Sequence, residues 1–482
     1  MFPPENKSIL QLDPEEHDVE EFHTRAGRWL LKIATPAILK KTPRKPLGPT
    51  SYLDGLRGFA AFLVYWQHHQ VWARVSIYAN NIFENSWGYE GRYYFVCLPG
   101  IRTFFTGGHL AVAVFFVISG HVLSTKPLMY IQTQNYAKLE ENLASALFRR
   151  WIRLHIPAIA TSFLYFTCWH IFGISTAYPD HRATWLEEFD EWYKQYFRTF
   201  SFAFPPTDAT ELWFTYNFHL WSIPVEFRGS VIIYTAQLAF SRFTHAKRLI
   251  CELVLIFYFL YLTDGWFCAM FMSGMLICDL DLLAKSNNLP PILNRFIPYK
   301  QQIIYTLFAI ASYFAGVPSS NGFSLDVIQN SPGWYYLSFI RSRSLDDYKW
   351  FFLFWAATFI VACIPHMPLL KAFFETRFNQ YLGRISFALY LVHGPILWTL
   401  SDKLYAAVGW SRDWNNEGIK EWENLWPLSK EGPLGFELSF WVPHLVILPV
   451  TLWLAEVGTA LFDKPSVTFS HWLYRSALPA KR

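Results

Sequence analysis

Two histidines and one glutamate lie inside long apolar segments of this sequence. His68 and His393 lie deep in two of the segments, and Glu226 lies about one turn inside a third. A charged group inside a membrane is costly, so each of these is a candidate functional residue. An imidazole can act as general acid or base near neutral pH, and a carboxylate can orient it or an acceptor.

Arginines gather at the start of another apolar segment. Arg149, Arg150 and Arg153 precede Pro157, and Arg150 and Arg153 share a helical face. Guanidinium groups bind phosphates in a bidentate manner, so these residues suit a phosphate-bearing acyl donor such as acyl-CoA.

The first apolar segment places a charged group on the same face as its histidine. Arg57 lies eleven residues before His68, so the two share one stripe of a helix and lie about 16 Å apart along its axis. Asp54 is on this stripe too, whereas His69 points about 100° away. We therefore expect His68 near the bilayer midplane, and Glu226 closer to the outer leaflet.

Each of these features also has a plainer explanation. The arginines can be topological anchors, and Asp54 with Arg57 can be a helix cap with a structural ion pair. A histidine in mid-span can serve as an interhelical hydrogen-bond partner, and Ser119-Gly120 can be a small-residue packing contact.

The composition predicts an integral membrane protein. Of 482 residues, 52% are hydrophobic, 19% are aromatic and only 16% are charged, and the mean hydropathy is +0.16. A water-soluble core cannot hide so much apolar surface, and disorder is excluded for the same reason. A net charge of +4 without a dense basic tract makes nucleic acid an unexpected partner. The six cysteines form no CxxC pair, so we expect neither a disulfide framework nor a zinc site.

The apolar runs predict about ten transmembrane helices that surround a polar midplane cavity. They cover residues 54–73, 108–125, 154–174, 221–241, 249–263, 265–283, 302–318, 350–365, 383–402 and 437–458. With this assignment the two sides hold 26 and 13 of the 41 lysines and arginines, and Arg57 and Arg228 lie inside spans. The positive-inside rule therefore places both termini in the cytosol.

Three parts are expected along the chain. Residues 1–50 form a cytosolic segment, in which Trp29, Leu30, Ile33 and Ala37 predict an interfacial amphipathic helix over 26–45. Residues 51–465 form the multi-pass membrane domain, and residues 466–482 form a cytosolic tail.

Five segments, taken together, resemble the acyltransferase-3 family of integral-membrane O-acyltransferases. They are Leu53–Gly58 (LDGLRG) followed by His68, Phe115–Gly120 (FFVISG), Arg149–Leu154 (RRWIRL), Leu220–Arg228 (LWSIPVEFR) and Leu382–His393 (LGRISFALYLVH). They occur in the family's order, and the fourth is similar to the fungal branch. No soluble hydrolase, zinc-protease or nucleotide-binding motif accompanies them.

The resemblance implies a ten-helix fold and transfer of an acyl group, commonly acetyl, from acyl-CoA to a hydroxyl. By position it implies a catalytic role for His68, Glu226 and His393. It also implies donor binding by Arg57, Arg150, Arg153 and Ser119, with support from Asp54, His121, Trp221, Ser222 and Tyr390. His121 departs from the family, which usually has Phe or Tyr there. Direct transfer needs no metal and no bound cofactor.

The acceptor and the compartment are open at this stage. Fungal members that resemble this chain acylate small secondary metabolites such as terpenoids or polyketides, whereas bacterial relatives acylate cell-surface sugars. A proton-coupled transporter and a lipid- or sterol-sensing scaffold are rival functions. We expect a multi-pass protein of the endoplasmic reticulum or another endomembrane, with the plasma membrane as the alternative.

The charge bias gives a testable topology. A tag at the C-terminus and a protease site in the 126–153 loop should both be accessible from the cytosolic side of sealed microsomes. A lumenal C-terminus would contradict this topology and the assignment of the donor side.

Overall fold

The computed structural model describes residues 27–28, 31, 33–39, 46–75, 79–202, 214–319, 324–410 and 419–479. The chain divides into two units, 1–45 and 46–482, and each is described by itself. In the first unit, Ile33 is helical and a short 3-10 helix covers Ala37–Leu39. Trp29 and Leu30 of the predicted amphipathic helix lie outside the described residues.

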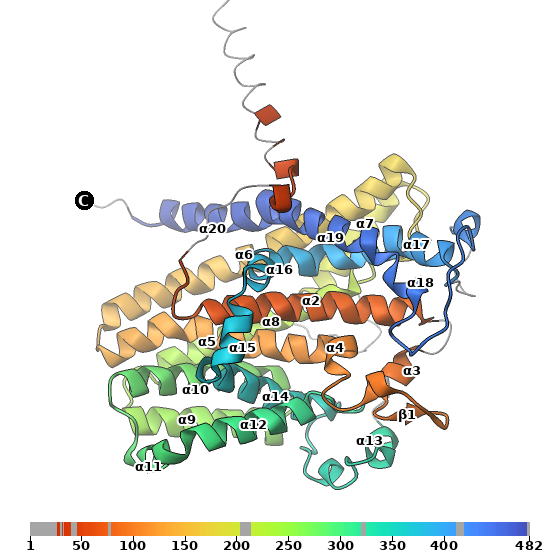
Figure 1. Cartoon of the computed structure of the whole chain (residues 1–482). Helices are drawn as coiled ribbons and strands as arrows, with labels where there is room; N and C mark the ends of the chain where they lie inside the picture. The colour runs from red at the N-terminus through yellow and green to blue at the C-terminus, as the bar shows by residue number, and fades with distance from the viewer. Residues whose placement is uncertain are drawn as a thin grey trace, which may run out of the picture. The chain divides into compact units, whose positions relative to one another are not determined.

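The second unit is helical, and a helix lies over each of the ten apolar segments (Figure 1). These helices are α2 (Ser51–Ala73), α5 (Gly108–Gln132), α6 (Tyr136–Phe172), α8 (Ser222–Ala239), α9 (His245–Phe257), α10 (Trp266–Lys285), α12 (Lys300–Phe314), α14 (Lys349–Cys363), α16 (Arg377–Ile396) and α19 (His444–Gly458). Four stretches are long and apolar enough to cross a membrane by length and composition, namely 108–132, 266–285, 349–366 and 438–476. Ten spans with cytosolic termini stay a prediction.

Short elements connect the long helices. They are α3 (Ala79–Glu84), α4 (Thr103–Thr106), α7 (Trp185–Thr199), α11 (Pro291–Asn294), α13 (Asp326–Asn330), α15 (Pro368–Phe374), α17 (Asp402–Ala407), α18 (Leu438–Trp441) and α20 (Lys464–Ser476). Strands β1 (Gly88–Tyr89) and β2 (Arg92–Tyr93) pair as an antiparallel hairpin. The described fold is otherwise all-α, as predicted, and all six cysteines are free.

Helix α2 lies against α16 with almost no space between the two backbones. A Cβ atom at Gly58 would lie 2.2 Å from the backbone nitrogen of Gly383, and one at Gly383 would lie 2.2 Å from the carbonyl oxygen of Asp54. Only glycine permits this approach. The glycines of the first and fifth segments therefore form one helix crossing.

A second close crossing joins α5 to α10. A Cβ at Gly120 would lie 2.0 Å from the carbonyl oxygen of Phe271, and one at Gly274 would lie 2.1 Å from that of Val117. The packing interpretation of Gly120 is correct. Its neighbour Ser119 makes a separate polar contact, described below.

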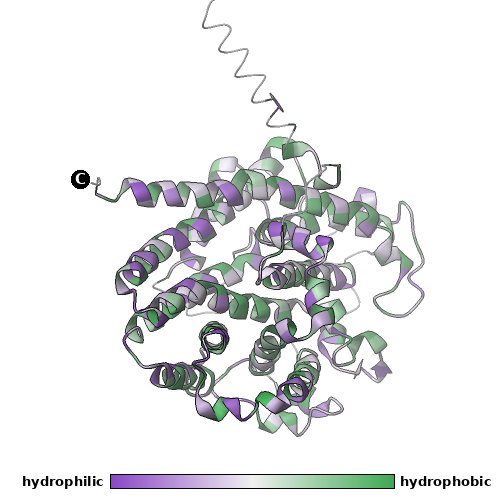
Figure 2. Ribbon diagram, turned by 60° about the vertical axis from the view of Figure 1, so that its left-hand side comes forward, coloured by the Kyte–Doolittle hydropathy of each residue, from purple (hydrophilic) through white to green (hydrophobic). Residues whose placement is uncertain are grey.

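Two helical rods are much longer than a bilayer core. Helix α6 has 37 residues, and α19 continues through a π-helical turn (Thr459–Asp463) into α20. At 1.5 Å per residue α6 spans about 55 Å, against about 30 Å of hydrocarbon. Figure 2 shows hydrophilic residues recurring along α20, close to the C-terminus. Helix α20 packs on α6, so both rods can extend beyond the membrane on one side.

The α5–α10 crossing predicts a graded response to small substitutions. Gly120→Ala should lower the thermal midpoint of the protein in detergent, because overpacking a fitted interface costs about 1–3 kcal/mol. Gly458→Ala is the matched control, since a Cβ at this helical position meets Ala388 at an ordinary 3.4 Å. Equal midpoints for the two variants, measured by fluorescence-detected size exclusion after heating, would refute the tight crossing.

Candidate active site

Three histidines from three elements meet inside the second unit. Helix α2 supplies His68, α16 supplies His393, and the 3-10 helix Phe218–Trp221 ahead of α8 supplies His219. Nδ1 of His68 lies 3.0 Å from Nε2 of His393. The ring of His219 lies 3.8 Å from that of His68 and 4.7 Å from that of His393. His219 and His393 are buried, and His68 is partly exposed.

The hydrogen bonds of this cluster fix which nitrogen of His68 is basic. Nδ1 of His393 lies 2.8 Å from the carbonyl oxygen of Tyr390, so it donates there and leaves Nε2 as an acceptor. Nδ1 of His68 then donates to that Nε2. Nε2 of His68 keeps its lone pair and makes no hydrogen bond within the described part of the chain. A free lone pair of this kind is what a general base requires, and the hydrogen bond to His393 orients the ring that carries it.

His69 has different surroundings from its neighbour. It is fully buried, its Nδ1 lies 2.8 Å from the hydroxyl of Tyr405, and its ring contacts Tyr65 and His444. The predicted 100° separation on the helix is therefore realised as two separate environments. His69 links helices and does not belong to the three-histidine cluster.

His219 was not predicted from the sequence. Its ring stacks on Trp398 with a centroid distance of 5.1 Å, and its Nε2 is buried without a hydrogen-bond partner among the described residues. In the sequence, His219 directly precedes the Leu220–Arg228 segment and lies two residues ahead of the apolar run that begins at residue 221. Helical periodicity counted from residues inside the apolar run could not include His219, which lies before that run.

One ring nitrogen from each of the three histidines lies within 4.8 Å of the other two, so they form a set that can hold a metal ion. Imidazole is a common zinc ligand, and catalytic zinc sites often use three protein ligands. The rings of His68 and His219, however, are tilted by 36° with centroids 3.8 Å apart, and Nδ1 of His68 is already within hydrogen-bond distance of Nε2 of His393. Metal-free transfer stays a prediction.

A second polar cluster surrounds Glu226. Ser119 donates to Oε1 of Glu226 at 2.7 Å, and Arg150 forms an ion pair with the same carboxylate. Nε of Arg150 also donates to the hydroxyl of Ser230 at 2.8 Å. Three candidates from separate segments, Ser119, Arg150 and Glu226, thus form one network among α5, α6 and α8.

The expected depth of Glu226 is wrong. His219, which contacts His68, precedes α8, and Glu226 lies seven residues further along the chain. Within α8 the carboxylate is therefore carried away from the histidines and toward Arg150, and the charge of Arg57 also acts on it. The prediction measured the depth of Glu226 from the start of the apolar run at residue 221. His219, which contacts His68, lies before that start.

The other two arginines that were predicted to bind the donor differ in their surroundings. Arg57 forms an ion pair with Asp54 at 3.1 Å and donates to the carbonyl oxygen of Gly383 at 3.0 Å. Arg153 is exposed, and it makes no hydrogen bond or ion pair within the described residues. Asp463 lies within electrostatic range of both Arg57 and Arg153.

The supporting residues divide between the site and the packing around it. Tyr390 donates to the carbonyl oxygen of His219, and the hydroxyl of Ser222 lies 2.7 Å from that of Tyr390. These contacts hold His219 between α8 and α16. Trp221 packs against Trp266 and Trp350. His121 lies 3.5 Å from Asp281, outside the three-histidine cluster.

Comparison with known proteins gives this arrangement a class. The profile of the acyltransferase domain matches residues 50–455, so the chain belongs to the acyltransferase-3 family. It is an acyltransferase-family enzyme, and the resemblance drawn from the five segments is confirmed.

Its curated relatives are fungal. The chain is 29% identical to the O-acetyltransferase PaAT-1 of Phomopsis amygdali over 461 residues, 90% of this chain and 86% of the relative. It is 22% identical to acyltransferase R4 of Phoma sp. (91% and 98% covered) and 23% identical to acyltransferase clz18 of Cochliobolus lunatus (90% and 97% covered). No solved structure matches the chain.

The geometry predicts unequal effects for the two adjacent histidines. His68→Ala should lower turnover by about 10²–10⁴-fold, the usual loss on removal of a general base. His69→Ala should stay within about tenfold of wild type, because it removes an interhelical hydrogen bond worth about 0.6–2 kcal/mol. Both are measured by initial rates at matched membrane abundance. A fully active His68→Ala would rule out His68 as the base, and equal losses would indicate a distorted α2.

Proposed function

We propose that this protein transfers an acyl group, acetyl in the first instance, from acyl-CoA to a hydroxyl group of a small molecule. The hydrogen-bonded pair His68–His393 is the observation that carries the proposal, because it leaves a basic nitrogen free on a partly exposed ring. A fungal secondary metabolite such as a terpenoid or polyketide is the acceptor class we favour. The similarity to PaAT-1 and to two fungal acyltransferases supports that choice.

The reaction follows from this geometry. Nε2 of His68 takes the proton of the acceptor hydroxyl while the oxygen attacks the thioester carbonyl carbon. His393 accepts from Nδ1 of His68 and keeps the ring in place as it becomes an imidazolium. Collapse of the tetrahedral adduct breaks the carbon–sulfur bond, and the CoA thiolate takes the proton from His68. Atoms and charges balance without an acyl-enzyme.

The arginine network belongs to the donor side in this proposal. Arg150 is neutralised by Glu226, and Ser119 also binds that carboxylate, so we assign the three residues to shaping the donor passage. Arg153 remains available for a phosphate. Glu226, which we had expected to assist His68, is assigned to Arg150 instead. The protein is proposed to span an endomembrane ten times, with the donor entering from the cytosol.

A direct test uses purified protein in detergent. Acetyl-CoA alone should release CoA thiol slowly, and an extract that contains the acceptor should accelerate the release; His68→Ala should abolish both. Metabolite profiling of a deletion strain should then reveal a compound lighter by one acyl group. A transporter or a sensing scaffold predicts neither result, so the absence of CoA release with every extract from the producing organism would refute acyl transfer.

A further inference from the structure

We propose that α20 and the adjoining part of α6 form a binding site for the nucleotide phosphates of the CoA donor, with His471, Arg475 and Arg149 as its main ligands. This inference rests on the proposed function. The sequence predicted only a cytosolic tail for residues 466–482.

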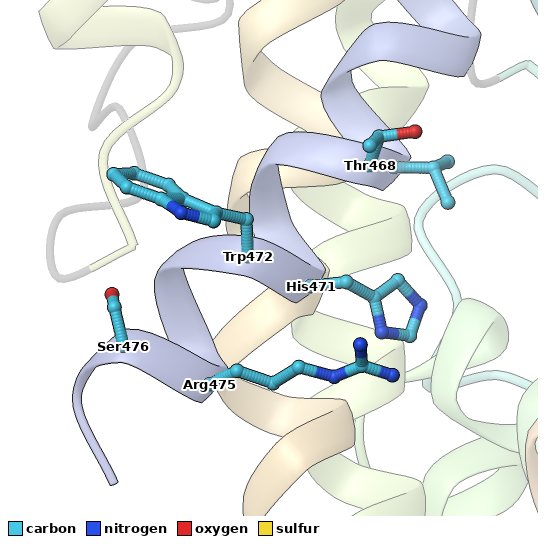
Figure 3. A pocket seen from close by; sticks show the side chains of 6 residues that line it. Thr468, His471, Trp472, Arg475 and Ser476 are labelled. Carbon is cyan, nitrogen blue, oxygen red and sulfur yellow. The ribbon is translucent and has the colours of Figure 1, made fainter.

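The site lies along the open surface of α20. A pocket of about 610 Å³ is lined by Val467, Thr468, His471, Trp472, Arg475 and Ser476. Figure 3 shows the side chains of His471 and Arg475 on the same side of the helix, one turn apart, while Trp472 and Ser476 lie on the other side. The side chains of His471 and Arg475 are both exposed.

Helix α6 adds a second arginine to this face. Nη1 of Arg149 lies 2.6 Å from Nε2 of His471, and the charges of Arg475 and Arg153 act on the same imidazole. Arg149 is otherwise held by Ser145, whose carbonyl and hydroxyl oxygens accept from its Nε at 3.0 Å. The guanidinium group is therefore fixed against His471 and can present its remaining donors to a ligand.

The cations outnumber the carboxylates around them. Asp463 faces Arg153, and Glu226 is taken by Arg150. The side chain of Arg475, like that of Arg153, makes no hydrogen bond or ion pair among the residues described. Arginines gathered with too few counter-charges repel one another, and a polyanion would relieve that repulsion while accepting charge-assisted hydrogen bonds. The diphosphate and 3′-phosphate of CoA have this chemistry.

The position also suits the reactive end of the donor. Asp463, at the start of α20, lies within electrostatic range of Arg57, and Arg57 lies about 16 Å before His68 on α2. A donor bound by its phosphates at α20 would therefore lie on the side of the protein from which Arg57 leads to the histidines.

Binding of free CoA separates this inference from catalysis. Kd is measured by titration calorimetry in neutral detergent for wild type and for the double variant His471→Ala/Arg475→Ala, with CoA and with pantetheine, which lacks the nucleotide. We expect the double variant to bind CoA about ten- to a hundredfold more weakly, the loss expected for one or two charge-assisted hydrogen bonds. Its affinity for pantetheine should be unchanged. Arg295→Ala, which removes an exposed arginine at the end of α11, is the matched control and should bind both ligands as wild type does.

Two results would overturn the inference. One is equal CoA affinity in wild type and the double variant, and the other is an equal loss for CoA and pantetheine, which would indicate a structural defect. A lipid phosphate is the competing ligand for this cluster. The same titration in nanodiscs with and without anionic lipid distinguishes the two ligands. A weaker CoA affinity of the double variant in both kinds of nanodisc supports the donor site. A weaker CoA affinity only in the anionic nanodiscs assigns the cluster to lipid. If wild type binds CoA through α20 but transfers no acyl group, the proposed function fails while this site stands.

Discussion

The close crossing of α2 and α16 is the constraint on which the catalytic geometry depends. Gly58 and Gly383 meet where a Cβ on either helix would collide with the other backbone. His68 lies ten residues beyond Gly58, and His393 lies ten residues beyond Gly383, so each is about 15 Å from the crossing. The two helices run in the same direction from this contact, and equal spacing brings the two imidazoles to one level, where they form a hydrogen bond. The donation of Arg57 to the carbonyl oxygen of Gly383 holds the register.

Buried charge alone does not identify the site in this fold. Arg74 with Glu437 and Arg248 with Asp279 are almost fully buried ion pairs, and each pair makes several hydrogen bonds. Such pairs add little net stability against an apolar alternative, but removal of one partner is costly. The histidine cluster differs because it keeps an unused acceptor on His68 and an unpartnered nitrogen on His219. These free nitrogens, more than burial, distinguish the histidine cluster from the buried ion pairs.

The sequence predicted the helices well, because long apolar runs in a chain of this composition have few alternatives. It also placed His68 and His393 in one site, since helical periodicity sets the face of a residue and five motifs in order supplied the partner helix. It could not give the contacts of Glu226 or Arg150, because the neighbour that each helix face meets is set by tertiary packing. His219 and α20 were missed for a related reason. Both lie outside the apolar runs: His219 just ahead of α8, and α20 just beyond α19.

The partner of the proposed base is itself a histidine, and this choice fits the surroundings. In many hydrolytic sites a carboxylate orients the catalytic imidazole and stabilises its charge. An ionised carboxylate in an apolar interior costs several kcal/mol unless a cation accompanies it, as Arg150 accompanies Glu226 here. A neutral imidazole can orient His68 without that cost, because it brings an acceptor and no net charge. It also stabilises the imidazolium less than a carboxylate would. In the proposed reaction the positive charge on His68 therefore has to be short-lived, and it is discharged when the CoA thiolate takes the proton. Proton removal and thiol departure at one histidine are thus coupled by the low polarity of the site.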